Sequence, residues 1–134
     1  MPTVGSTATV HPAPRQDKPW GNEIIFAAQD DRYVGKIIHV NAGNSLSLQY
    51  HTFKDETISV ISGTAVTQFG PSADELTEQV LHSGDTIHLP PGAVHRVTPF
   101  TDLVFVEAFT ADPGWREGVT RIQDDYGREG TNQP

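Results

Sequence analysis

Short segments of alternating apolar and polar residues, separated by turn-forming residues, fill most of this chain from residue 32 onward. They are rich in Val, Ile, Thr and Phe, which suit half-buried strands, and no long stretch has the period of a helix. Many short strands at regular spacing predict an all-β fold, either a sandwich or a jelly roll. The expected strands are residues 32–40, 45–51, 56–62, 65–69, 76–82, 86–89, 94–100 and 103–109.

The chain length of 134 residues fits one domain with a buried core. Residues 1–17 are rich in Thr, Ala and Pro without an apolar period, so we expect a mobile N-terminal arm. We expect the β domain over residues 18–128 and a short tail over residues 129–134. No apolar run is long enough for a membrane span, and the N-terminus lacks the layout of a signal peptide. We therefore expect a cytoplasmic protein without a membrane partner.

Composition restricts the chemistry available to this chain. It contains no cysteine, which excludes disulfides and thiolate ligands, so any metal must be bound by nitrogen and oxygen. The formal net charge of −8 argues against a nucleic-acid partner, because binding phosphate backbones needs a basic face. A small anionic substrate stays compatible with this charge, since a few local cations can receive it.

Four polar residues near strand ends form a candidate metal-binding set. The period-2 rule places Ser47, Gln49 and His51 on one face of their strand. Glu56 begins the next strand and would lie beside His51 if the two strands form a hairpin, and a proline–glycine turn precedes His95. Two histidines, a carboxylate and an amide oxygen suit a divalent first-row metal and leave room for water or substrate. The alternative is that these are unrelated polar residues near turns.

The spacing of these residues resembles two known motifs. The pattern G-x5-Q-x-H-x4-E-x6-G over residues 43–63 resembles the first cupin motif, with Gln in place of its usual leading His. The pattern G-x5-P-x-G-x2-H over residues 84–95 resembles the second cupin motif. This resemblance implies a cupin jelly roll, a double-stranded β-helix barrel.

A closer resemblance extends over residues 18–128. The segments KPWG, RYVGKIIHVNAGNSLSLQYH, DETISVISGTA, LPPGAVHRV and VTRIQDDYGR are similar to the mannose-6-phosphate isomerase-like cupins, including the isomerase domain of bifunctional enzymes and small stand-alone relatives. This resemblance implies a homodimer, and a divalent metal ion (Zn, Mn or Fe, or else Co or Ni). The ligands it implies are Gln49, His51, Glu56 and His95.

One departure from that family concerns the substrate more than the metal. The isomerase domains tend to have a His-rich, Arg-containing run after the leading Gln and a His after the Glu. This chain has Thr52, Phe53 and Lys54, and then Thr57, at those places.

Five further residues are candidates for catalysis or for substrate binding. We expect Lys36 or His88 to act as the acid or base that moves a proton. We expect Ser47, Phe53 and Arg121 to line the substrate pocket. Tyr126 and Arg128 belong, with Arg121, to a tail that could close over the barrel or cross to a second subunit. For each of these residues a packing or solvated role is the alternative.

The function implied by the resemblance is aldose–ketose isomerisation of a small polar metabolite such as a sugar phosphate. A metal of this kind polarises a carbonyl and stabilises the negative charge of an enediolate. One alternative is an Fe(II) dioxygenase, because two histidines and a carboxylate resemble the facial triad of oxygenases, or else a metal-dependent lyase or cyclase. Another is a non-catalytic cupin that binds a sugar or small ligand, since one fold hosts many functions.

Overall fold

The computed structural model describes residues 4–116 and 119–124, and this part of the chain contains eleven β-strands and no helix. Within the described residues, therefore, no helix has the length and apolar character needed to cross a membrane. The strands are β1 (Arg15–Lys18), β2 (Gly21–Gln29), β3 (Tyr33–Val40), β4 (Leu48–His51), β5 (Glu56–Ser62), β6 (Ala65–Gly70), β7 (Thr77–Leu81), β8 (Thr86–Leu89), β9 (Val94–Pro99), β10 (Leu103–Thr110) and β11 (Val119–Gln123).

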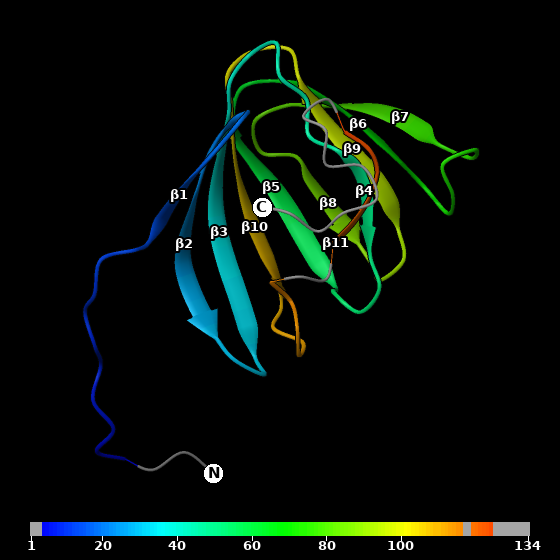
Figure 1. The fold of residues 1–134 in the computed structure, drawn as a ribbon. Coiled ribbons are helices and arrows are strands. Elements are labelled where there is room, and N and C mark those ends of the chain that lie inside the picture. Colours follow the sequence, from blue (N-terminus) through cyan, green and yellow to red (C-terminus); the bar gives the residue numbers. More distant parts are fainter. Residues whose placement is uncertain (1–3, 117–118, 125–134) are drawn as a thin grey trace.

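The strands form two antiparallel sheets that face each other (Figure 1). One sheet has the order β1-β2-β3-β10-β5-β8 and the other has the order β11-β4-β9-β6-β7. Strands far apart in the sequence are neighbours, as where β10 lies between β3 and β5. The predicted all-β jelly roll is thereby confirmed.

Alternation along the strands places the core between the two sheets. In β10 the buried side chains are Leu103, Phe105 and Phe109, while the residues between them are less buried. Phe105 belongs to a large apolar cluster with Trp20 and other buried residues. Phe109 belongs to a smaller cluster that includes Trp115. The charged residue between these apolar positions, Glu107, lies on the same inward-facing side of β10.

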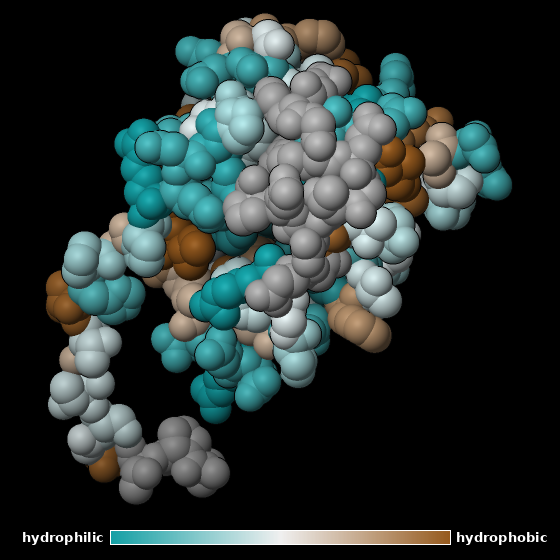
Figure 2. Space-filling model, viewed as in Figure 1, coloured by the Kyte–Doolittle hydropathy of each residue, from teal (hydrophilic) through white to brown (hydrophobic). Residues whose placement is uncertain are grey.

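The N-terminal arm is shorter than the sequence analysis predicts. Residues 15–17 lie in β1, which pairs with β2 in the register Arg15↔Ile24 and Asp17↔Asn22. Residues 4–14 are exposed and contain no strand, and the carbonyl of Pro14 accepts a 3.0 Å hydrogen bond from the N–H of Ile25 on β2. Farther from β1, the segment stands apart from the barrel (Figure 2).

The strands of His51 and Glu56 do not form a hairpin, so these two residues are not neighbours in one sheet. His51 ends β4 in the second sheet, whereas Glu56 begins β5 in the first. Residues 52–55 therefore carry the chain from one sheet to the other, and His51 meets Glu56 across the interior. Sequence pattern identifies two strands joined by a short turn, but it does not show whether they pair side by side or face to face.

Candidate metal centre

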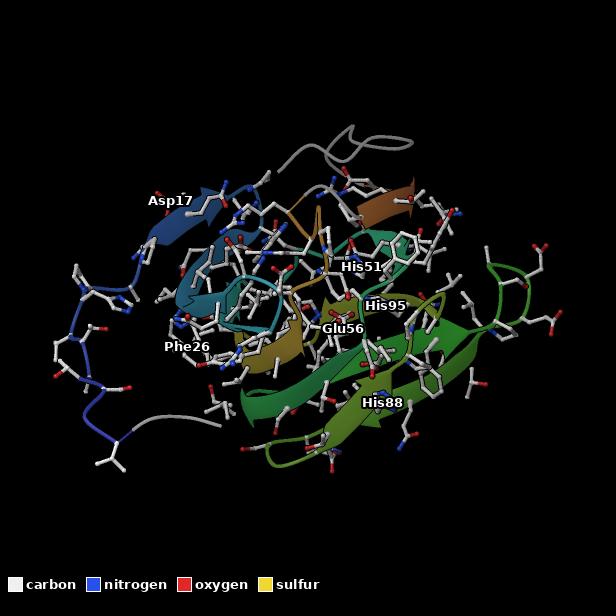
Figure 3. The ribbon with its side chains drawn as sticks, turned by 90° about the horizontal axis from the view of Figure 1, so that it is seen from below. Asp17, Phe26, His51, Glu56, His88 and His95 are labelled. Carbon is white, nitrogen blue, oxygen red and sulfur yellow. The ribbon has the colours of Figure 1, made fainter. Side chains whose placement is uncertain are left out.

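Three of the predicted metal ligands meet in the interior of the barrel. The ligand atoms of His51, Glu56 and His95 all lie within 4.8 Å of one another, and all three residues are buried. They come from the end of β4 and the starts of β5 and β9, and their side chains point toward one another (Figure 3). No other group of His, Asp and Glu side chains with this geometry occurs among the described residues.

The environment of His51 keeps its imidazole neutral. Burial, assisted by the nearby Lys54 ammonium, lowers the pKa of His51 to about 3. Its Nδ1 is buried and has no hydrogen-bond partner among the described residues. A neutral imidazole is the form that binds a metal ion.

A backbone carbonyl orients His95. Its Nδ1 lies 3.1 Å from the carbonyl oxygen of Ala93, which is the place of a donated N–H hydrogen bond. In the tautomer with the proton on Nδ1, the lone pair of Nε2 is free for a metal ion, and Nε2 lies 3.2 Å from Oε1 of Glu56. Metal-bound histidines are commonly held by such an outer hydrogen bond.

The carboxylate of Glu56 is held in its charged form. Burial alone would raise the pKa of Glu56, but short-range interactions with Glu107 and His95 lower it below the ordinary value. Neither carboxylate oxygen of Glu56 accepts a well-formed hydrogen bond among the described residues. Two buried imidazoles and a buried carboxylate with unused lone pairs fit a divalent cation.

Gln49 lies next to this group. It is the register partner of His95 and lines the same cavity. The hydroxyl of Ser47 donates a 2.8 Å hydrogen bond to Oε1 of Gln49 and so fixes the direction of that oxygen. The placement is compatible with a fourth ligand supplied by Gln49, which stays a proposal.

A cavity of about 550 Å³ opens beside the centre, with His51 and His95 in its wall. Three other predicted site residues, Lys36, Ser47 and Arg121, also line it. Arg121, on β11, is the register partner of Gln49 and is buried. Tyr126 and Arg128 lie outside the described residues.

Two predicted site residues lie elsewhere. His88 is on the outer face of β8, with its side chain 61% exposed and Nε2 2.6 Å from Oδ1 of Asp55 (Figure 3). The reason is that Ile87 and Leu89 pack into the core, which turns His88 outward. Phe53 is 73% exposed in the turn after β4 and does not line the cavity.

Sequence reasoning missed five charged residues of the cavity wall: Lys18, Glu23, Lys54, Glu107 and Arg116. The two carboxylates each interrupt the inward-facing apolar side of a strand, and this interruption is the signal that could have found them. Burial raises the pKa of Glu107 well above its ordinary value, with a further contribution from Glu56. Burial lowers the pKa of Lys54, against the opposing effect of Glu107.

A jelly-roll barrel with this His–Glu–His group inside it defines a cupin. Residues 6–108 match the family model described as mannose-6-phosphate isomerase C-terminal, and the chain belongs to this family.

Two curated relatives are enzymes or biosynthesis proteins of much greater length. The chain is 32% identical over 114 residues to the xanthan biosynthesis protein XanB of Xanthomonas campestris pv. campestris, and the match covers 83% of this chain and 23% of that protein. It is 28% identical over 114 residues to mannose-1-phosphate guanylyltransferase 2 of Escherichia coli O157:H7, and this match covers 84% of this chain and 22% of that protein. The chain therefore spans less than a quarter of the length of these relatives.

Two solved structures share the fold. The capsular polysaccharide assembling protein CapF from Staphylococcus aureus has a TM-score of 0.73 at 21% identity, covering 85% of this chain and 32% of that one. Oxalate decarboxylase from Bacillus subtilis, a protein with Mn(II) centres, has a TM-score of 0.66 at 21% identity. This match covers 79% of this chain and 29% of that one.

Proposed function

We propose that this protein is a metal-dependent aldose–ketose isomerase that acts on a sugar phosphate. The observation that carries the proposal is the meeting of His51, Glu56 and His95 beside a cavity large enough for a small metabolite. The family supports the sugar-phosphate substrate, because its model is named for the C-terminal part of mannose-6-phosphate isomerase.

His51, Glu56 and His95 would hold the metal, with Gln49 as the proposed fourth ligand. A divalent ion bound there supplies a Lewis acid that stabilises negative charge developing on the substrate oxygens. Zinc, manganese and iron suit this donor set, as do cobalt and nickel. Which of these ions is bound therefore also depends on which ion is available to the protein. Manganese gains support from the Mn(II) centres of oxalate decarboxylase, which shares the fold.

Lys36 and Glu107 are the side chains that we propose for proton transfer. They are register partners on β3 and β10, and both line the cavity. Isomerisation needs one group to take a proton from the carbon that bears the hydroxyl and return it to the former carbonyl carbon. Glu107 replaces His88 in this role, because His88 lies on the outer surface.

The test is an isomerase assay with D-mannose 6-phosphate in D2O. The proposal predicts fructose 6-phosphate that carries deuterium, a loss of at least about a hundredfold in rate in Lys36→Met or Glu107→Gln, and an unchanged rate in His88→Ala. A metal-loaded protein that binds the sugar phosphate without turnover would contradict the isomerase and favour the non-catalytic cupin.

The same three ligands also suit a second candidate, an Fe(II) dioxygenase, because two histidines and one carboxylate are the ligand set of such enzymes. Phe53, which was expected to line the substrate pocket, is exposed and gives this candidate no support. Oxygen consumption that depends on iron and an added organic substrate would favour it over the isomerase.

The homodimer and the cytoplasmic location stay predictions. Light scattering at micromolar concentration tests the first, and a monomer would contradict it. Fractionation of cells that produce the protein tests the second.

A further inference from the structure

Three cations of the cavity wall lie over two aromatic rings. Nζ of Lys54 is 3.9 Å from the ring centroid of Phe109, and Nζ of Lys36 is 5.5 Å from the same centroid. Nζ of Lys36 is also 5.8 Å from the ring of Trp115, and the guanidinium of Arg116 is 4.0 Å from that ring. We call these five residues the aromatic–cation cluster.

The two rings are fixed by packing. Phe109 and Trp115 are buried and meet edge to face, with centroids 5.5 Å apart and planes at 63°. The loop that carries Trp115 is held by its own hydrogen bonds. Its backbone N–H donates to the carbonyl of Asp112 at 3.0 Å, and the hydroxyl of Thr110 donates to the Asp112 carboxylate at 2.7 Å. The rings therefore form a rigid support for the cations.

A ring face holds a cation without cancelling its charge, which a carboxylate would do. Five of the nine Lys and Arg residues of the chain line the cavity, against two carboxylates, Glu23 and Glu107. Glu23 lies 3.3 Å from Lys36, and the partner of Arg116, Asp30, is 3.7 Å away on the solvent side. In a chain of net charge −8, this cavity gathers positive charge.

We propose that the aromatic–cation cluster is an anion subsite for a phosphate group, separate from the metal ligands. Lys54 and Arg116 contact the phosphate, while Phe109 and Trp115 act as positioning residues that keep these two cations in place. Lys36, which is paired with Glu23, adds to the positive wall and keeps its proposed role in proton transfer. The subsite deepens the proposed function, and rests on it only in taking the phosphate to be that of the isomerase substrate. Phosphate binding is measurable without turnover.

The test measures binding of inorganic phosphate, D-mannose 6-phosphate and D-mannose by calorimetry to the full chain, as purified and after chelation. We expect the chelated protein to bind both phosphates and not mannose. Phe109→Leu and Trp115→Leu should weaken phosphate binding about tenfold, within the range of a desolvated cation–aromatic contact. Phe109→Tyr and Trp115→Tyr, which keep a ring, should retain affinity within about threefold.

Two further variants separate this role from folding. Arg116→Gln changes a side chain that is 58% exposed, so it should fold, keep its metal content and lose phosphate affinity several-fold. Phe26→Leu makes the Phe→Leu change at a ring on the outer surface and should alter nothing in binding.

These binding measurements test the anion subsite independently of the proposed isomerase reaction. Absence of phosphate binding, or equal affinity in the wild-type, Leu and Arg116→Gln proteins, would overturn the subsite whatever the isomerase assay gives. Ring-dependent phosphate binding without isomerase activity would support the subsite and contradict the proposed reaction. Tighter binding of mannose 6-phosphate than of inorganic phosphate identifies a substrate subsite, and the reverse order identifies free phosphate as the occupant.

Discussion

Oε1 of Glu56 lies 3.2 Å from Nε2 of His95 inside the barrel, although β5 and β9 belong to different sheets. The jelly roll brings the two together because the starts of both strands face the same interior space. His51, at the end of β4, completes the group from the side of β9. The centre thus depends on how the two sheets pack, and not on the pairing of neighbouring strands.

Ser47→Ala should weaken metal binding by about tenfold or more, because outer hydrogen bonds that orient ligands commonly contribute this much. The hydroxyl of Ser47 donates to Gln49 at 2.8 Å, so its loss frees the amide that we propose as fourth ligand. Titration of the chelated protein with zinc or manganese measures the affinity. Ser59→Ala, on the outer side of β5, is the matched control. Equal affinity in the Ser47→Ala and wild-type proteins would argue that Gln49 is not a ligand.

Stability of the metal-free protein should fall below pH 6.5 because of His51. Its folded pKa of about 3 lies below the ordinary value of 6.5, so between these values the unfolded chain binds more protons and acid favours unfolding. The charged and titratable groups around it are Lys54, Glu56, His95 and Lys36. This site can remove at most about 1.4 kcal/mol of unfolding free energy per pH unit.

The variant His51→Gln isolates that contribution. Urea unfolding of the chelated proteins at several pH values between 6.5 and 4 should show a shallower pH dependence in the variant than in the wild type. Identical slopes would mean that His51 is protonated in the folded state over this range.

Gly63→Ala should destabilise the fold more than Gly43→Ala. Both glycines have positive φ, +92° and +82°, which costs other residues about 1 kcal/mol or more. A Cβ at Gly63 would also lie 2.2 Å from the carbonyl oxygen of Asp102, whereas a Cβ at Gly43 would have no atom within 4 Å. Thermal unfolding of both variants gives the comparison. Equal loss in the two would show that the backbone around Asp102 yields to the methyl group.

Phe105→Ala should lower the free energy of unfolding by about 3–5 kcal/mol, since it removes a large side chain from a packed interior. Phe105 is 2% exposed and belongs to the main apolar cluster. Phe100→Ala removes the same atoms at a position that is 61% exposed and should cost far less. Denaturant unfolding measures both changes, and a loss under about 1.5 kcal/mol in Phe105→Ala would contradict the assigned core.

Local pattern was enough to locate most strands. The segments 56–62 and 86–89, bounded by glycine, proline and aspartate, coincide residue for residue with β5 and β8. Side-chain alternation and turn chemistry depend on near neighbours in the chain, and the sequence displays both.

The face of each strand was harder to predict. In β8 the period of two separates His88 from Ile87 and Leu89, but it does not tell which set points inward. The apolar pair decides this through core packing, and His88 is exposed. Glu107 shows the opposite case, because its strand is apolar on the inward side and the cavity accommodates the one charged residue there.

The candidate ligand set, His51, Glu56 and His95, could be identified because the motif spacing carries information that single positions lack. Spacing alone, however, does not state that His51 and Glu56 approach across the barrel, since this depends on how the two sheets pack. The cation-rich wall is likewise assembled from strands distant in sequence, which is why Lys36 was the only member of the aromatic–cation cluster among the predicted site residues.

The most direct test of the metal centre is the metal content of the untagged full-length protein by mass spectrometry, compared with His51→Ala. We expect close to one divalent ion per chain in the wild type, and loss of that ion in the variant while the β fold remains. Wild-type protein that takes up no ion from zinc, manganese or iron, or a variant that keeps the ion, would contradict the assignment of His51, Glu56 and His95 as a metal centre.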